Sequence, residues 1–245
     1  MNNIINLENQ HISRKQKTCF QSSHPINIYA AFIGPNPITS FSPYAYCPNI
    51  HPSSFVGPFS SIIGAVIVDE NVFIAPSASI RADEGYPFYI GKNTNLQDGV
   101  ILHGLKDERV GVKGKLYSIY IGNNVTCAHD SIVHGPCYVG DNCFIGFKAI
   151  VFNAILEEGV YVSSNSLVTN GITIPERRFV PPGASIDSQE KADALNRVPA
   201  DKEAFAQEVI RVNTEFPQSY SLSFGYYRCS CGLACDEPLC SKHRD

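Results

Sequence analysis

A branched aliphatic residue returns at every sixth position along most of the chain, with three changes of step. The series comprises Ile50, Val56, Ile62, Val68, Ile74, Ile80, Ile90, Leu96, Leu102, Ile121, Cys127, Val133, Val139, Ile145, Val151, Leu156, Val162, Val168, Ile174, Val180 and Ile186. A period of six fits neither an α-helix nor a simple alternating strand. It fits a coil of short strands that meet at corners, with one aliphatic side chain per strand pointing inward.

Hexapeptide repeats of this kind are typical of a parallel β-helix. Three hexapeptides form one turn, so the series predicts an all-β fold of about seven turns. Glycine and asparagine recur after the aliphatic positions, as expected at corners. The spacing does not determine the handedness of the coil. An ordinary β-sandwich with coincidental spacing is the alternative.

Two longer steps in the series predict loops that leave the repeat without disturbing it. They span residues 84–89, which read EGYPFY, and residues 104–118, which read GLKDERVGVKGKLYS. We therefore expect the β-helix to occupy residues 49–187. Residues 1–48 show little period and contain several prolines, so we expect them to form a loose arm with extended pieces.

Residues 188–216 change to helical spacing, which predicts a C-terminal α-helix packed on the outside of the coil. Pro199 divides this segment. Asp201 is the expected N-cap of the helix and Pro217 its expected stop. Residues 217–245 form a cysteine-rich tail.

Composition narrows the function classes. Hydrophobic residues make up 44% of the chain and charged residues 17%, which excludes disorder for the bulk of it. The net charge of -4 and the lack of any run of Lys or Arg argue against a nucleic-acid partner. No apolar run is long enough for a membrane span, and the first twenty residues lack the apolar core of a signal peptide. We expect a cytoplasmic protein.

The nine cysteines fall into two groups. The dispersed ones, which we expect to act as small hydrophobes in a reducing compartment, are Cys19, Cys47, Cys127, Cys137 and Cys143. The crowded ones are Cys229, Cys231, Cys235 and Cys240. Their spacing matches no common zinc module, so a metal site, a redox pair and a tail without a site remain open.

Arg81, His103 and His134 each directly follow an inward-facing repeat residue. If the loops leave the order of faces unbroken, these three side chains point outward from one face on consecutive turns. Neighbouring strands lie about 4.8 Å apart, so two imidazoles can share one ion. The alternative is a chance stack of surface histidines.

His129 falls on a different face, so within one subunit we do not expect it to reach that ion. In a three-fold oligomer, however, the neighbour's His129 can complete a set of three imidazoles, and closed symmetry repeats the site at every interface. Three neutral nitrogens with an open fourth position are typical of catalytic zinc.

Arg81, Asp83 and Gln97 occupy turns beside His103. A buried arginine at an interface needs a carboxylate partner, for which Asp98 and Asp83 are the candidates. An interface salt bridge without a catalytic role is the alternative for these residues.

Three stretches of the chain resemble the gamma-class carbonic anhydrases. They are residues 80–104, 134–154 and 180–184, which read IRADEGYPFYIGKNTNLQDGVILHG, HGPCYVGDNCFIGFKAIVFNA and VPPGA. The resemblance covers roughly residues 48–216 and is strongest to the N-terminal domain of β-carboxysome assembly proteins. It implies a left-handed β-helix and a homotrimer with zinc shared between subunits. It also implies an association with the carboxysome, including its shell or scaffold proteins.

The resemblance also implies roles for single residues. His103 and His134 match the metal ligands of one protomer, and His129 matches the ligand of its neighbour. Glu84 matches an acidic position linked to proton transfer. The residues that match those shaping the pocket for water and bicarbonate are Arg81, Asp83 and Gln97.

These roles predict the hydration of CO₂ to bicarbonate. Zinc lowers the pKa of water to about 7, so hydroxide is available at neutral pH to attack CO₂. We expect Gln97 to orient the hydroxide or the bicarbonate, Asp83 to accept a hydrogen bond and Arg81 to hold the pocket. Glu84 is then the proton carrier. Fe²⁺ or Co²⁺ suits the same three ligands.

Two departures from the family pattern keep other functions open. Lys106 stands where the family has a second shuttle glutamate, although Asp107 and Glu108 lie nearby. Carboxysome assembly proteins usually continue into domains that resemble the Rubisco small subunit, which this sequence lacks. The alternatives are a catalytically inactive scaffold that binds carboxysome components, and a hexapeptide acyltransferase with one histidine as general base and coenzyme A as cofactor.

Overall fold

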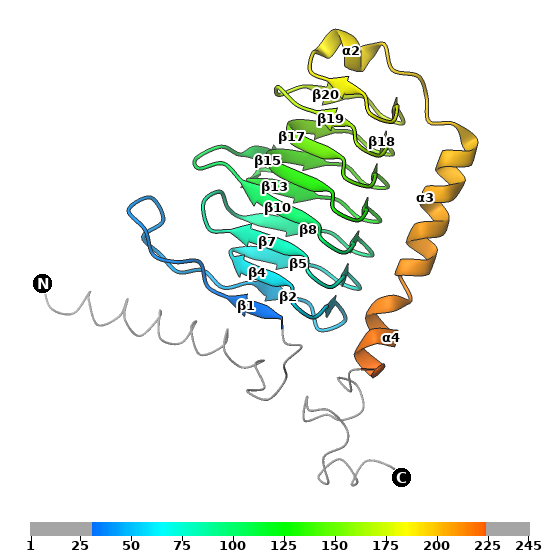
Figure 1. The fold of residues 1–245 in the computed structure, drawn as a ribbon. Coiled ribbons are helices and arrows are strands. Elements are labelled where there is room, and N and C mark those ends of the chain that lie inside the picture. The colour runs from blue at the N-terminus through cyan, green and yellow to red at the C-terminus, as the bar shows by residue number, and fades with distance from the viewer. Residues whose placement is uncertain (1–30, 224–245) are drawn as a thin grey trace, which may run out of the picture.

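The computed structural model describes residues 31–223. The predictions on the first thirty residues, on Cys19 and on the four-cysteine tail therefore lie outside the described residues. Figure 1 shows a parallel β-solenoid of about eight turns with helices along one side, so the predicted parallel β-helix is confirmed.

The strands stack in three strips, one on each side of the coil. The histidine strip contains β1 (Phe32–Gly34), β4 (Ser61–Gly64), β7 (Ser79–Ala82), β10 (Ile101–Gly104), β19 (Leu167–Val168) and β22 (Ser185–Ile186). The tyrosine strip contains β2 (Asn49–Ile50), β5 (Val66–Val68), β8 (Phe88–Ile90), β13 (Ile119–Ile121) and β20 (Thr173–Ile174).

The helix-covered strip contains β3 (Phe55–Val56), β6 (Phe73–Ile74), β9 (Asn95–Leu96), β14 (Thr126–Cys127), β16 (Phe144–Ile145), β18 (Tyr161–Val162) and β21 (Phe179–Val180). Two longer strands, β15 (Ile132–Val139) and β17 (Ile150–Leu156), pass from the histidine strip into the tyrosine strip. All pairings between turns are parallel and in register, apart from one shift between His134 and Cys137.

The aliphatic repeat fills the interior of the coil. From Ile62 to Ile186, every repeat residue is buried, whereas Ile50 and Val56 in the first turn are partly buried. Burying a Val, Leu or Ile side chain contributes about 1.5–3 kcal/mol, so this column is the main source of stability. Its parallel stacking places equivalent residues of successive turns above one another.

Asparagines at one corner explain how the chain turns between the tyrosine and helix-covered strips. Asn71, Asn93, Asn124 and Asn142 all adopt a left-handed backbone, with φ between 53 and 60°. Asparagine tolerates this conformation better than most residues. The first three side-chain amides each donate to the next asparagine at 3.1–3.3 Å, and the Asn142 amide donates to Glu158, so the corner forms a continuous hydrogen-bonded ladder.

The arm and one insertion contain strands of their own. Strand β1 lies within the predicted arm and pairs in parallel with β4, which extends the coil beyond the seven turns expected. The loop at 104–118 forms an antiparallel hairpin of β11 (Val110–Val112) and β12 (Lys115–Tyr117). Arg109, just before the hairpin, lies 5.3 Å from the centre of the Tyr86 ring.

Up to residue 223, where the described part of the chain ends, three helices follow the coil: α2 (Gln189–Asp193), α3 (Ala200–Asn213) and α4 (Phe216–Ser223). Two predictions about their ends were wrong. Pro199, not Asp201, is the N-cap of α3, and it leaves Asp201 in the first turn. Pro217 does not stop the helical segment, because it lies in the first turn of α4, where a missing N–H is tolerated.

Helices α3 and α4 cover the third strip by packing on its outward aromatic rings (Figure 1). Phe144 stacks on Tyr161 at 4.5 Å between ring centres and meets Phe205 of α3 edge-on at 5.6 Å. Phe73 meets Phe216 of α4 at 5.1 Å. No helix in the described part of the chain is long and apolar enough to cross a membrane.

Three of the dispersed cysteines behave as predicted. Cys127, Cys137 and Cys143 are buried and form no disulfide bond, and burial raises the pKa of Cys137 and of Cys143 to about 12. Their thiols therefore stay protonated and pack as small hydrophobes. Cys47 is different, because it forms a disulfide bond, which corrects the expectation for that residue.

Candidate metal site

His103 and His134 lie on adjacent strands of the histidine strip, in the same position of consecutive turns. Strand β10 pairs with β15 so that His103 stands opposite His134, and β10 pairs with β7 so that His103 stands opposite Arg81. This register confirms the predicted stack. Both imidazoles point outward, because the residue before each of them is the buried repeat residue.

Each of the two rings directs one of its nitrogens at the other ring. Nδ1 of His103 and Nε2 of His134 are 3.1 Å apart, and the ring planes meet at 70°. Nδ1 of His134 lies 3.2 Å from the Gly135 carbonyl, which can only accept, so this nitrogen carries the proton. The lone pair of His134 Nε2 therefore points at His103.

The protonation of His103 depends on its two polar neighbours. Its Nε2 lies 3.2 Å from a carboxylate oxygen of Asp83 and 3.3 Å from Nη2 of Arg81. When Nε2 donates to Asp83, the lone pair of His103 Nδ1 faces that of His134. Two such lone pairs repel unless a cation lies between them.

This pair of nitrogens fits a zinc ion. A tetrahedral zinc held at about 2.0–2.1 Å by two nitrogens places them about 3.3 Å apart, close to the separation found here. Burial lowers the pKa of His134 below its ordinary value, and the neighbouring His103 acts in the same direction. His134 is therefore neutral at pH 7, the form that binds metal.

Arg81, Asp83 and Glu84 surround His103. Arg81 Nε lies 3.5 Å from Asp83, so Asp83 is the carboxylate partner that the sequence left undecided between two residues. Glu84 lies 3.8 Å from His103 Nε2 through one oxygen and accepts the Lys106 backbone N–H at 3.3 Å through the other. The structure thus brings two of the predicted pocket residues, Arg81 and Asp83, and the predicted proton carrier Glu84 together with the histidine pair.

His129 lies apart from them, at the corner after strand β14 of the helix-covered strip. Its side chain is 51% exposed, and its Nδ1 lies 3.1 Å from Asp98. Across the described residues, no group of three His, Cys, Asp or Glu side chains is placed to hold a metal. One subunit by itself therefore supplies two clustered imidazoles and an isolated third.

Gln97 is buried at the same corner region as His129, two positions after Asn95. Its side-chain amide donates to Asn95 at 3.2 Å, and Asn95 donates to Thr126 at 2.9 Å. The structure does not bring Gln97 to the histidine pair within one chain. Sequence reasoning missed Asn95, which a search for polar side chains at outward repeat positions would have found.

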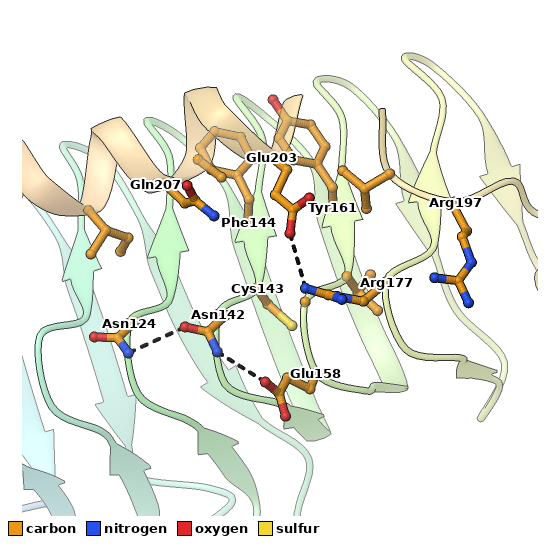
Figure 2. A pocket seen from close by; sticks show the side chains of 15 residues that line it. Asn124, Asn142, Cys143, Phe144, Glu158, Tyr161, Arg177, Arg197, Glu203 and Gln207 are labelled. Atoms are coloured by element: carbon orange, nitrogen blue, oxygen red, sulfur yellow. Dashed lines mark hydrogen bonds and ion pairs between the residues drawn. The ribbon is translucent and has the colours of Figure 1, made fainter. Parts of the chain in front are cut away.

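A second cleft lies between α3 and the corners of the coil, and Figure 2 shows it from close by. Its volume is about 480 Å³. An ion pair between Arg177 and Glu203 at 3.2 Å crosses it, and Asn142 donates to Glu158 at 3.2 Å on its rim. None of the predicted site residues lines this cleft. It belongs to the packing of α3 against the coil.

Comparison with known proteins decides the family. No family model matches the sequence. The chain is 40% identical to the carbonic anhydrase of Methanosarcina thermophila over an aligned length of 198 residues, and the match covers 76% of this chain and 79% of that protein. The chain belongs to the gamma-class carbonic anhydrases.

Within this family, the chain is also similar to carboxysome assembly proteins. It is 46% identical over 191 residues to the protein CcmM of Nostoc sp., covering 78% of this chain. It is 43% identical over 164 residues to CcmM of Synechococcus elongatus, covering 66% of this chain. The chain spans about a third of the length of these relatives, 33% and 30% respectively.

Solved structures with the same coil include a putative acetyltransferase of Bacillus cereus. Its TM-score is 0.62 at 24% identity, over 78% of this chain and 96% of that one. A hexapeptide transferase family protein of Anaplasma phagocytophilum has a TM-score of 0.56 at 22% identity, over 71% and 93%. At such low identity these likenesses support the fold alone, and they do not make the chain an acyltransferase.

Proposed function

We propose that this gamma-class family member is a zinc-dependent carbonic anhydrase whose sites form between the subunits of a homotrimer. His103 and His134 of one subunit and His129 of the next would hold the metal. The observation that carries the proposal is the pair of imidazole nitrogens 3.1 Å apart on consecutive turns. Membership of the family connects this pair to the hydration of CO₂.

A trimer explains why the third ligand lies apart. His129 is too far round the coil to join the pair in its own subunit, yet half of its surface is exposed. Closed three-fold symmetry brings the same corner of each subunit against the same strip of the next, and so repeats one site three times. Bound zinc would supply hydroxide at neutral pH by lowering the pKa of water to about 7.

The remaining residues of the site orient groups and move a proton. Asp83 pairs with Arg81 and accepts the Nε2–H of His103, so it keeps the imidazole in place, and both residues line the pocket. Gln97 would orient the nucleophile or bicarbonate from the neighbouring subunit, since it lies on the same side of the coil as His129. Hydration releases a proton, and Glu84 is the acceptor that we assign to it.

The position of Glu84 suits this role. One carboxylate oxygen faces His103, and the side chain is 40% exposed, so the group connects the pocket with solvent. Lys106 offers no second carboxylate, and its ammonium instead pairs with Asp107 at 2.6 Å. Proton release therefore depends on Glu84 more than it would in a site with two shuttle carboxylates.

A second candidate function is a scaffold of the carboxysome without catalytic activity. The similarity to CcmM and the lysine at position 106 favour it. Such a protein would keep the fold and the zinc and bind carboxysome components through the outer surfaces of the trimer. Both candidates place the chain in the cytoplasm, associated with the carboxysome.

The test combines metal analysis with stopped-flow CO₂ hydration on the purified full chain. We expect one zinc per subunit and hydration activity, and we expect His103→Ala to lose both. His51→Ala is the matched control, because His51 is a histidine outside the site. Retained activity in His103→Ala refutes the proposal. Zinc without hydration, under reducing and oxidising conditions alike, favours the scaffold.

A further inference from the structure

Asp98, His129 and Phe147 occupy one column at a corner of the coil. Each lies two positions after an inward-facing repeat residue, on consecutive turns. Strand β14 pairs in register with β9 on one side and with β16 on the other. The turns are also joined at the corner itself, because Asp130 N donates to the Asp98 carbonyl at 2.9 Å and Lys148 N to the His129 carbonyl at 3.0 Å.

The His129 ring is held between the other two side chains of this column. A carboxylate oxygen of Asp98 lies 3.1 Å from His129 Nδ1. The Phe147 ring lies parallel to the imidazole, at an angle of 4° and 5.7 Å between centres. The carboxylate therefore constrains the ring from the preceding turn, and the phenyl group constrains it from the following turn.

This arrangement selects one protonation state of the neutral ring. The contact is an ion-pair distance, and a carboxylate cannot donate a hydrogen bond, so its oxygen favours the proton on the nitrogen beside it. Nε2 then keeps its lone pair, because the contact with Asp98 is made through Nδ1. The free nitrogen sits on a side chain whose exposed fraction is 51%.

We propose that Asp98 and Phe147 are positioning residues, which fix the tautomer and the ring plane of His129 for a metal ion shared with the neighbouring subunit. The part concerning the metal rests on the proposed function. The part concerning tautomer and ring plane concerns one chain only and stands on the contacts given above.

The isolated position of His129 is the reason that it needs such support. His103 and His134 contact one another, and His103 also contacts Arg81 and Asp83. His129 shares none of these contacts. Without Asp98 and Phe147, its ring would have to be ordered when metal binds, which would weaken affinity.

Nuclear magnetic resonance of the ¹⁵N-histidine-labelled full chain, freed of metal with a chelator, tests the first part. We expect wild-type His129 to carry its proton on Nδ1. Asp98→Ala should shift the ring toward the other tautomer, and Asp98→Asn should restore the wild-type state, because its amide oxygen still accepts. Phe147→Leu should move the His129 ring-proton signals through the loss of ring current.

Zinc competition titration tests the second part, with Co²⁺ absorption reporting the ligand geometry. We expect Asp98→Ala to weaken zinc affinity about 10–100-fold, the usual effect of removing a partner of a ligating histidine. Phe147→Leu should weaken it less. Asp130→Asn and Phe205→Leu are the matched controls, because they change a neighbouring carboxylate and a ring that packs on Phe144 and not on any of the three histidines.

The results separate the two proposals. Protonated Nε2 in the wild-type chain, or zinc binding by the wild type that Asp98→Ala leaves unchanged, overturns the positioning role. Wild-type spectra as expected, together with no zinc binding at all, overturn the proposed function instead. Circular dichroism and light scattering on each variant identify any that has lost its fold or assembly, and such a variant is replaced by Asp98→Ser or Phe147→Met.

Discussion

The helix-covered strip and the histidine strip share one interior but differ completely on their outer faces. Inward, both present buried aliphatic residues from the same repeat, such as Leu96 in one and Leu102 in the other. Outward, the first presents aromatic rings that α3 and α4 of the same chain bury. The second presents Arg81, His103 and His134, which stay partly exposed.

The aromatic outer face stabilises the coil, whereas the polar outer face carries the residues of the candidate site. The aromatic strip is completed within the chain, because an apolar surface must be removed from water for the fold to be stable. The histidine strip keeps polar side chains on its outer face. Their nitrogen and oxygen atoms remain available to bind a ligand or to contact another subunit. A β-helix can therefore change its chemistry on one strip while the interior stays the same.

The largest effect should come from the interior, equally in both strips. Leu96→Ala and Leu102→Ala each remove a fully buried side chain and should each destabilise the chain by about 2–5 kcal/mol. Urea unfolding of the metal-free chain, followed by circular dichroism, measures this. If one substitution lowers the unfolding free energy several times more than the other, the inward faces of the two strips do not contribute equally to stability.

Outward substitutions should separate stability from metal binding. Phe144→Ala removes a ring stacked between Tyr161 and α3, and should cost about 3 kcal/mol without changing zinc content. His134→Ala should lose zinc, yet cost about 1 kcal/mol or less in the metal-free chain. Urea unfolding and metal analysis of both variants give the comparison. Zinc loss in Phe144→Ala would show that the two strips are coupled.

The third side of the coil offers a pH-dependent contact for comparison. The Tyr89 hydroxyl donates to Asp69 at 2.6 Å, so Tyr89→Phe should cost about 1–2 kcal/mol at pH 7. Burial by itself raises the pKa of Asp69, but the Tyr89 hydrogen bond and nearby charges outweigh it and lower that pKa. Burial, followed by the bond to Asp69, raises the pKa of Tyr89.

These two directions set the pH window of the effect. A lowered carboxyl pKa contributes stability above about pH 4, which is lost as the pH falls through the folded-state value. A raised phenol pKa contributes stability below about pH 10, which is lost as the pH rises through the folded-state value. Wild type and Tyr89→Phe should therefore differ most between about pH 5 and 9. A constant difference down to pH 2 would contradict the assignment.

The smallest effect should come from the ion pair that links α3 to the coil. The side chains of Arg177 and Glu203 are 63% and 48% exposed, and exposed pairs contribute little. Arg177→Gln should change the unfolding free energy by about 0.5 kcal/mol or less. A loss above 1 kcal/mol in the same unfolding assay would show that the polar rim, and not the aromatic packing, holds α3 in place.

Much of this molecule was predictable because each turn repeats the last. One aliphatic residue in six predicts the coil, and the loops preserve the register, so the sequence correctly places His103 and His134 on adjacent strands. The segments outside the repeat were predicted less well. The arm was expected to contain extended pieces, but the pairing of β1 with the coil was not predicted, and Pro199, not Asp201, caps α3.

The repeat could not predict the directions in which side chains point at the corners of the coil. Register alone puts Asp98, His129 and Phe147 in one column, but whether a carboxylate or a phenyl ring contacts the imidazole depends on rotamers and on the backbone of each turn. Likewise, Asp83 and Asp98 were equal candidates as partner of Arg81 until the structure paired Arg81 with Asp83. Such choices depend on distances of a few ångströms, which the spacing of residues in the sequence does not determine.

The regular spacing of Val, Ile and Leu is enough to specify a coil and the faces on which its histidines lie, because burial acts on each turn in the same way. Only the tertiary structure determines three other features: the cover supplied by α3 and α4, the bonds around His103 and the column that holds His129. They arise where segments that are distant in sequence meet, and local pattern carries no information about such meetings.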